Sequence, residues 1–448
     1  MKVHRSPRLA YAGLSSLLVL AALVAPGSAL AKGSKTQCSG VNIAGQGASV
    51  NSVAQKEVWD PQFNLSASKF ACNGTQGTLA KPTVTYTNTG SGQGLESWGE
   101  FGKVVPNYGP TNAYIGTSET PDAAIISEIA SHETTPTPNQ VETIPVTQLA
   151  IATIVNLPTG CTATSTAAPG RLVLSDATLE GIFNGSITTW GQITDGGDAL
   201  TGTGCTTAPI VPVVRFDQAG TTHILKRFLG LINTGALATE KGSQTWDQLS
   251  EGALNTTWPS ALALVRPAKK GDAEEAAKVA STPGSIGYGN LAEIRAGGKF
   301  SKAGEGGAGT AKFWTEIESE SKKGKAKYQD PATNGDVEAG AEANCKKTLY
   351  TNGASPFPPP AVSDPWNEVT TKLAEKTYPL CGFTYILTIK SYSLFPGTEA
   401  GEAETVKDIL QFITDKKGGQ LALAGHDYNA LPKAVLKEAA EGAAGITF

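Results

Sequence analysis

Residues 83–94 read TVTYTNTGSGQG, and this stretch decides the fold class. Thr83 to Thr87 alternate as a half-buried strand does, a glycine-rich turn follows at 88–94, and a helix-like segment starts near Leu95. The same order recurs around GQGAS (45–49) and around DQAGTT (217–222). Repetition of strand, glycine-rich turn and helix predicts an α/β fold with parallel sheets, in which ligands bind beyond the carboxyl ends of the strands.

The length and composition describe a globular chain of two or three domains. It has 448 residues, of which 40% are hydrophobic and 17% are charged, and such a chain can bury substantial cores. Beyond residue 31 it carries 33 basic and 40 acidic residues. This acidic balance argues against binding to nucleic acid, although local dipoles can still hold a small anion.

Residues 1–31 have the features of a cleaved secretory signal peptide. Lys2, Arg5 and Arg8 precede an apolar run at 14–24, and Ala29 and Ala31 provide small residues for the peptidase. A retained anchor is the alternative, but the run is shorter than the roughly 20 residues that a span needs. The residues before Cys38 are too polar for a lipid-attachment motif, so we expect a secreted or periplasmic protein.

Six cysteines follow the expected signal peptide: Cys38, Cys72, Cys161, Cys205, Cys345 and Cys381. An even number in an exported chain predicts disulfides, and pairing of nearest neighbours (38 with 72, 161 with 205, 345 with 381) is our expectation. No C-x-x-C spacing occurs, and the four histidines show no metal-ligand spacing. We therefore expect no metal and no cofactor.

Three turns, at 45–49, 90–94 and 217–222, combine glycine with a hydroxyl residue and precede a helix. The first turn of a helix offers unpaired N–H groups and a partial positive charge, which together bind anions. One such turn alone is ordinarily only a helix cap. Three of them that converge on one point would surround a tetrahedral oxyanion with donors.

These motifs resemble the phosphate-binding proteins of bacterial ABC importers, within the two-lobed periplasmic-binding-protein superfamily. GQGAS (45–49) resembles the first anion loop of that family, YTNTGSG (86–92) the second, IGTSE (115–119) the third and VVRFDQAGT (213–221) the fourth. Residues 174–190 are similar to a helical segment common in the family, and SIGY (285–288) also fits. The order is kept over about residues 43–290.

The resemblance implies a type II fold with two mixed or parallel sheets joined by two crossing segments, near 144–149 and 376–381. Lobe I would comprise 32–146 and 376–448, and lobe II would comprise 147–345. Residues 297–355 are rich in Gly, Lys and Glu, so we expect an irregular, exposed insertion there. Residues 346–375 would form a proline-containing connection.

The resemblance also implies the ligand-binding residues Ser49, Ser91, Glu119, Arg215, Gly220 and Thr221. Asp217 would hold the Arg215 guanidinium by an ion pair, and Thr222 would support the site. Glu119 stands where the family has Asp, and Ala219 where it has Ser. A carboxylate in an anion site accepts a hydrogen bond from the O–H group that hydrogen phosphate carries and sulfate lacks, so Glu119 would select phosphate.

The function implied is capture of inorganic phosphate by closure of the lobes of a monomer, followed by delivery to an ABC permease. Two alternatives keep the fold: a site for another oxyanion, or a receptor-like or adhesin-like extracellular role. An enzyme is a third alternative, because His223 lies beside the fourth loop. A metal-dependent phosphatase needs clusters of Asp and His, and a serine hydrolase of the α/β type needs G-x-S-x-G; the sequence contains neither.

Overall fold

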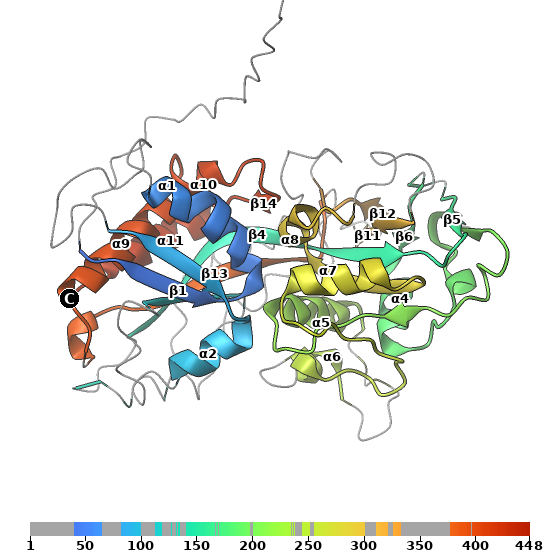
Figure 1. Ribbon diagram of the computed structural model, residues 1–448, viewed down its shortest axis with the longest axis horizontal. Helices are drawn as coiled ribbons and strands as arrows, with labels where there is room; N and C mark the ends of the chain where they lie inside the picture. The colour runs from blue at the N-terminus through green and yellow to red at the C-terminus, as the bar shows by residue number, and fades with distance from the viewer. Residues whose placement is uncertain are drawn as a thin grey trace, which may run out of the picture.

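The computed structural model describes residues 40–64, 82–99, 113–118, 140–165, 167–168, 170–197, 200–233, 244–250, 255–300, 311–320, 326–332, 377–395 and 397–448, with single positions at 127, 131, 133, 134, 235 and 237. Figure 1 shows two halves side by side, with β4 (Val141–Asn156) running between them. We call the half that holds the N-terminal strands lobe I and the other half lobe II. Within the described ranges, no helix is long and apolar enough to cross a membrane.

Lobe I is built from the N-terminal and C-terminal parts of the chain. Its strands are β1 (Ile43–Gly47), β2 (Val84–Asn88), β3 (Tyr114–Thr117), β13 (Cys381–Ile389) and β14 (Tyr428–Asn429). Its helical segments are η1 (Ser49–Asn51), η2 (Ala54–Trp59), α1 (Asp60–Asn64), α2 (Ser91–Gly99), η9 (Tyr392–Leu394), α9 (Ala400–Thr414), α10 (Gly419–Ala422) and α11 (Lys433–Gly445). β1 pairs in parallel with both β2 and β3, as the repeated motif predicts.

Lobe II is built from the middle of the chain. Its strands are β5 (Thr162–Ala163), β6 (Val173–Leu174), β7 (Leu200–Thr201), β8 (Val211–Pro212), β9 (Ser285–Asn290), β10 (Lys312–Trp314), β11 (Glu316–Glu320) and β12 (Ala326–Gln329). Its helical segments are α4 (Asp176–Asn184), η4 (Trp190–Gln192), η5 (Asp195–Gly197), α5 (Gly220–Ile232), α6 (Trp246–Ser250), α7 (Asp272–Ser281) and α8 (Leu291–Ala296). In Figure 1, α4 to α8 all lie in this half.

The strand β4 belongs to the sheets of both lobes. Its N-terminal part pairs antiparallel with β13, and its C-terminal part, from Ile151 to Asn156, pairs antiparallel with β9. The sheet order is therefore one continuous path, β2-β1-β3-β13-β4-β9-β8. All of β4 after Val141 is buried, because both faces of a strand in this position are covered. The two lobes thus share one continuous strand as a structural element.

Local sequence signals set several helix boundaries. Ser175 caps α4, since its side chain accepts a hydrogen bond from the Thr178 amide at 3.2 Å, and Gly185 ends the helix with φ 83°. The helix lies within residues 174–190, where the family resemblance predicts one. The helical segment after the turn at 45–49 is divided into η1, η2 and α1. The strand before the turn at 217–222 is short, Val211–Pro212, and Pro212 has no N–H with which to extend a ladder.

The prediction of an irregular insertion was wrong for residues 312–320 and 326–329, which form strands. β10 pairs with β4, and β11 pairs with β6 and β12. Phe313, Trp314 and Ile317 are buried, so this short apolar group anchors a segment whose overall composition is polar. The rest of the expected insertion and the expected proline-containing connection lie mostly outside the described residues, as does the expected signal peptide.

The disulfide predicted between Cys161 and Cys205 is present. It joins the strand region of β5 to the loop after β7, and both cysteines are buried. Cys381 is also disulfide-bonded, with a partner that the described residues do not include. Cys38, Cys72 and Cys345 lie outside the described residues.

Candidate anion-binding site

The three predicted turns come together where the lobes meet. In lobe I, Ser49 starts η1 and Ser91 starts α2; in lobe II, Gly220 starts α5. The amide of Gly92 donates to the Gln218 carbonyl at 3.2 Å, which joins the second and fourth loops across the boundary. A Cβ atom built on Gly92 would lie 2.2 Å from the Cβ of Gln218, so only glycine allows this approach.

Arg215 is the cation at the centre of this junction, and its side chain is 1% exposed. Its Nε donates to Asp217 Oδ1 at 2.7 Å and its Nη2 donates to Asp217 Oδ2 at 2.5 Å, which is the ion pair expected from sequence. Its Nη1 faces Ser49 Oγ of lobe I at 3.4 Å. Burial would lower the pKa of the guanidinium, but Asp272 and Asp217 raise it above its ordinary value, so Arg215 stays charged.

Asp272 is a member of the site that sequence reasoning missed. It is the first residue of α7, is fully buried, and accepts a hydrogen bond from Arg215 Nη1. Thr221 Oγ1 donates to it at 2.8 Å, and the Asn290 amide donates to its Oδ2 at 3.1 Å. In the sequence Asp272 is simply an acidic residue in the first turn of a helix, a position that acids favour anyway. Its proximity to Arg215 depends on the tertiary fold.

Ser118, in the third loop, faces the start of α5. A Cβ atom built on Gly220 would lie 1.5 Å from Ser118 Oγ and 2.7 Å from Ser118 Cβ. The Ser118 hydroxyl is buried and has no hydrogen-bond partner within the described part of the chain. The N-cap of α5 is Ala219, which makes no side-chain cap. A buried hydroxyl and an uncapped helix N-terminus thus face each other across the lobes.

The remaining predicted residues have the following positions. Ser91 Oγ shares a hydrogen bond of 2.8 Å with Thr117 Oγ1, the residue before Ser118. Thr222 Oγ1 bonds to the hydroxyl of Tyr288 at 2.6 Å and therefore acts within lobe II. Glu119 lies outside the described residues. Arg215 contacts Ser49 directly, and Asp272 joins Arg215 to Thr221. Gly220 lies against Ser118, and the loop of Ser91 meets lobe II through Gly92.

Two buried carboxyl groups lie behind Arg215. Burial raises the pKa of Glu275 well above its ordinary value; Arg215 opposes this shift and Asp272 adds to it. Glu275 Oε1 accepts from the Tyr288 amide at 3.2 Å. Burial also raises the pKa of Glu293 on α8 to about 8, and Asp272 contributes to that increase. Glu293 therefore tends to hold its proton at neutral pH, when an unperturbed carboxyl would not.

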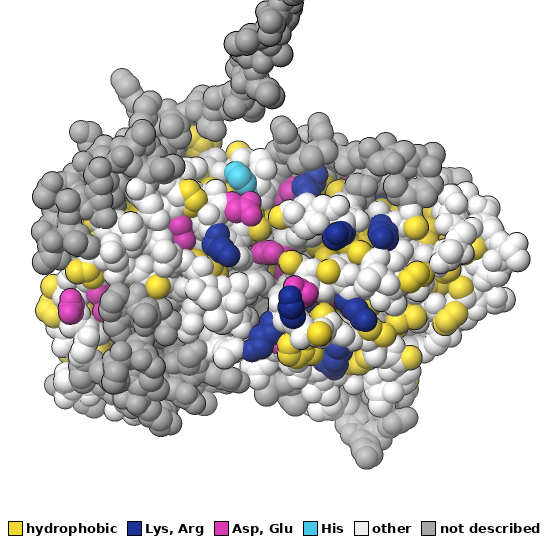
Figure 2. All heavy atoms as spheres, viewed as in Figure 1, with side chains coloured by type: hydrophobic (Ala, Val, Ile, Leu, Met, Phe, Trp, Pro, Cys, Tyr) yellow, Lys and Arg dark blue, Asp and Glu magenta, His cyan; other side chains and the backbone are white. Residues whose placement is uncertain are grey.

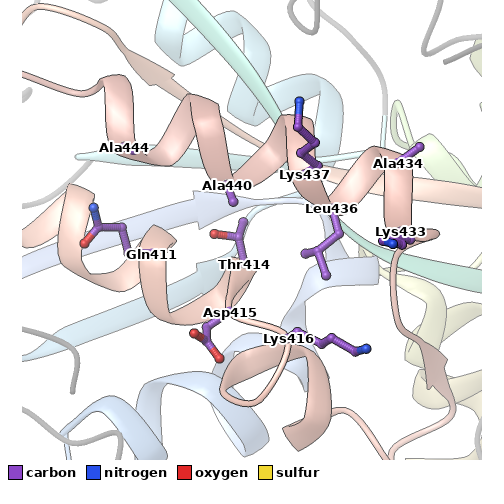
Figure 3. A pocket seen from close by; sticks show the side chains of 10 residues that line it. All are labelled: Gln411, Thr414, Asp415, Lys416, Lys433, Ala434, Leu436, Lys437, Ala440 and Ala444. Atoms are coloured by element: carbon purple, nitrogen blue, oxygen red, sulfur yellow. The ribbon is translucent and has the colours of Figure 1, made fainter. Parts of the chain in front are cut away.

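A separate groove of about 780 Å³ lies in lobe I between α9 and α11. Figure 3 shows Ala440, Leu436 and Thr414 along it, with Lys416, Lys433 and Lys437 around them. None of the predicted site residues that the structure describes lines this groove. In the described ranges, no group of three His, Cys, Asp or Glu side chains is arranged to hold a metal ion.

Comparison with known proteins agrees with this architecture. No curated protein sequence matches the chain. Among solved structures, PfluDING, a high-affinity periplasmic phosphate-binding protein with phosphate bound, has TM-score 0.55 and 20% identity over 89% of this chain and 92% of its own. A phosphate-binding protein from Stenotrophomonas maltophilia has TM-score 0.60 and 19% identity over 90% and 93%. A human phosphate-binding apolipoprotein has TM-score 0.53 and 18% identity over 88% and 93%.

At these identities the likeness shows a common fold, which is the mixed α/β fold of periplasmic binding proteins. The family and these structural relatives are binding proteins rather than enzymes. Residues 75–417 match the family model described as a PBP superfamily domain. Because this match covers most of the sequence, the chain belongs to the PBP superfamily.

Proposed function

We propose that this protein is an extracytoplasmic solute-binding protein that captures phosphate between its two lobes and passes it to an ABC permease. The protein works as a monomer that opens and closes. Lobe I comprises 32–146 and 376–448, lobe II comprises 147–345, and the junction of β4 with β13 is the hinge region. Residues 1–31 direct export and are removed.

The observation that carries the proposal is the Ser118 hydroxyl at the start of α5. A buried hydroxyl without a partner costs free energy, on the order of 1–3 kcal/mol, unless something accepts or donates there. The uncapped amides at Gly220, Thr221 and Thr222 favour an anion at the same place. A tetrahedral oxyanion satisfies both lobes at once.

The ligand contacts follow from these positions. In lobe I, Ser49 and Ser91 donate to ligand oxygens and Glu119 accepts a hydrogen bond from the ligand O–H group. In lobe II, Arg215 supplies the cation, and Gly220 and Thr221 supply the helix amides. Asp217 orients Arg215 through two hydrogen bonds. Ala219 contributes no hydroxyl, and Ser118 supplies one from the opposite lobe.

The relatives and the surface charge support phosphate as the ligand. The three structures described above are named as phosphate-binding proteins. In Figure 2, Lys and Arg side chains gather over the half of the face where α5, α6 and α7 lie. Arg266, Lys269 and Lys270 are exposed in the loop before α7, and Lys270 bonds to Gln93 of lobe I. Such charges attract an anion towards the boundary between the lobes.

The proposal is tested by calorimetric titration of the purified protein with phosphate and with sulfate near neutral pH. We expect saturable binding of phosphate with a Kd of about 1 μM or tighter, and none of sulfate. A folded protein that gives no heat with either anion would contradict phosphate capture and favour a receptor-like role.

Substitution of Gly220 by Ala tests whether the lobes close on the ligand. The added methyl group would collide with Ser118, and overpacking of this kind costs about 1–3 kcal/mol, so phosphate should bind roughly 5- to 150-fold more weakly. Gly445→Ala is the matched control, because a Cβ at Gly445 meets nothing within 4 Å. Equal affinities for these two variants would show that the Gly220–Ser118 contact is absent from the bound state.

A further inference from the structure

Asp272 accepts hydrogen bonds from two of the proposed ligand-binding residues, Arg215 and Thr221. Its carboxylate accepts from Arg215 Nη1 and from Thr221 Oγ1, which is 2.8 Å from Oδ1 and 3.0 Å from Oδ2. An ionised carboxylate can only accept, so the single proton of the Thr221 hydroxyl points to Asp272. Towards a ligand, Thr221 then offers lone pairs, and it is satisfied by a ligand that brings its own O–H group.

The net charge of the buried side chains at the junction of the lobes also favours a protonated ligand, because each proton lowers the negative charge of the ligand. Arg215 carries one positive charge, while Asp217 and Asp272 carry two negative charges, and side-chain exposure is at most 5% for all three. A doubly charged anion would be placed beside a cluster whose net charge is already negative. At short range and in a low dielectric, each additional like charge costs several kcal/mol. A singly charged anion meets a much smaller penalty.

The other titratable groups that face Asp272 do not reverse this charge. On its own helix, α7, burial raises the pKa of Glu275, which favours the neutral form of that group. Glu293 on α8 has a pKa raised to about 8, and it becomes negative rather than positive when it ionises. Tyr288 on β9 and Tyr428 on β14 have pKa values raised by burial, so they are neutral. Lys56 and Glu57 on η2 act on Glu293 with opposite effects on its pKa, and Arg215 is the cation in direct contact with Asp272.

We propose that Asp272 is a specificity-determining residue that restricts the site to singly charged, protonated phosphate. This inference rests on the proposed function, and it goes beyond that function by naming the protonation state of the ligand. Selection by Glu119 alone would admit doubly charged hydrogen phosphate. In mildly alkaline solution phosphate is mainly the doubly charged ion with one proton. If Asp272 selects the singly charged ion, phosphate must therefore take up a second proton when it binds.

The test is titration with inorganic phosphate between about pH 6 and pH 8.5, in two buffers with different ionisation enthalpies. On the alkaline side, we expect uptake of close to one proton per phosphate and an affinity that falls about tenfold per pH unit. Asp272→Asn removes one negative charge and should bind phosphate at least about tenfold more tightly than wild type at the alkaline end, with a flatter pH dependence.

Asp176→Asn is the matched control, since Asp176 is also the first residue of a lobe II helix, α4, and lies outside the proposed site. It should keep the wild-type pH dependence. A wild-type protein that binds phosphate without proton uptake would overturn the inference and leave the proposed function intact, whether or not Asp272→Asn folds. An unchanged pH dependence in folded Asp272→Asn would do the same. A folded wild-type protein that binds no phosphate at any pH would overturn both.

Discussion

Replacement of Arg215 by Met should destabilise the protein strongly, in addition to abolishing ligand binding. Met keeps most of the side-chain volume and removes the charge. In wild type, Arg215 is the partner of Asp217, through Nε and Nη2, and of Asp272, through Nη1. The variant leaves both carboxylates buried without their cation.

The size of the effect follows from burial. The side chains of Arg215, Asp217 and Asp272 are 1%, 5% and 0% exposed, so water cannot replace the lost partner. Breaking a buried ion pair by removal of one partner costs about 3–5 kcal/mol. Asp272 keeps its hydrogen bonds from Thr221 and the Asn290 amide, which places the expected loss towards the lower end of that range.

The assay is urea denaturation followed by tryptophan fluorescence, with the change in the free energy of unfolding as the readout. Arg227→Met is the matched control: its ion pair with Asp247 has a separation of 3.3 Å, and the Asp247 side chain is 56% exposed. Removal of such a surface pair costs about 0–1 kcal/mol.

A third protein, in which Arg215→Met is combined with Asp217→Asn and Asp272→Asn, should regain much of the stability, because no unpaired charge stays buried. If Arg215→Met is as stable as Arg227→Met, the buried ion-pair cluster does not stabilise the fold. If the triple variant is no better than the single one, unpaired charge is not the cause of the loss.

Three other predictions concern the rest of the chain. Burial raises the pKa of Glu402 on α9 to about 8, so at neutral pH the folded state keeps a proton that the unfolded state releases. Relative to Glu402→Gln, the wild-type free energy of unfolding should therefore fall by up to about 1.4 kcal/mol per pH unit between about pH 5 and pH 8. Urea denaturation of both proteins across this range tests the prediction, and an equal pH dependence would contradict it. Substitution of both Cys161 and Cys205 by Ser should lower the free energy of unfolding by about 4 kcal/mol, because the disulfide closes a loop with a sequence separation of 44. An unchanged urea-denaturation curve would disprove this. Glu119→Gln should reduce discrimination between phosphate and sulfate, measured by titration with both anions; unchanged selectivity would remove Glu119 from that role.

Much of the lobe architecture could be predicted from local sequence patterns. Strand, glycine-rich turn and helix recur because each unit is formed by neighbouring residues, and β1, β2 and α2 lie close to where the pattern indicates them. The cap at Ser175 is also a local feature. The strands β10, β11 and β12 were missed because the few buried aromatic and aliphatic residues in this part of the chain are surrounded by polar ones.

By itself, the sequence determined the loops that carry hydroxyl groups, glycine and Arg215, since these are motifs of a few adjacent residues. Only the tertiary structure decided the electrostatic character of the site. Asp272 reaches Arg215 from 57 residues away, and Ser118 meets Gly220 from the opposite lobe. Residue periodicity reports the conformation of one segment, whereas the charge of a site depends on which distant segments the fold packs together.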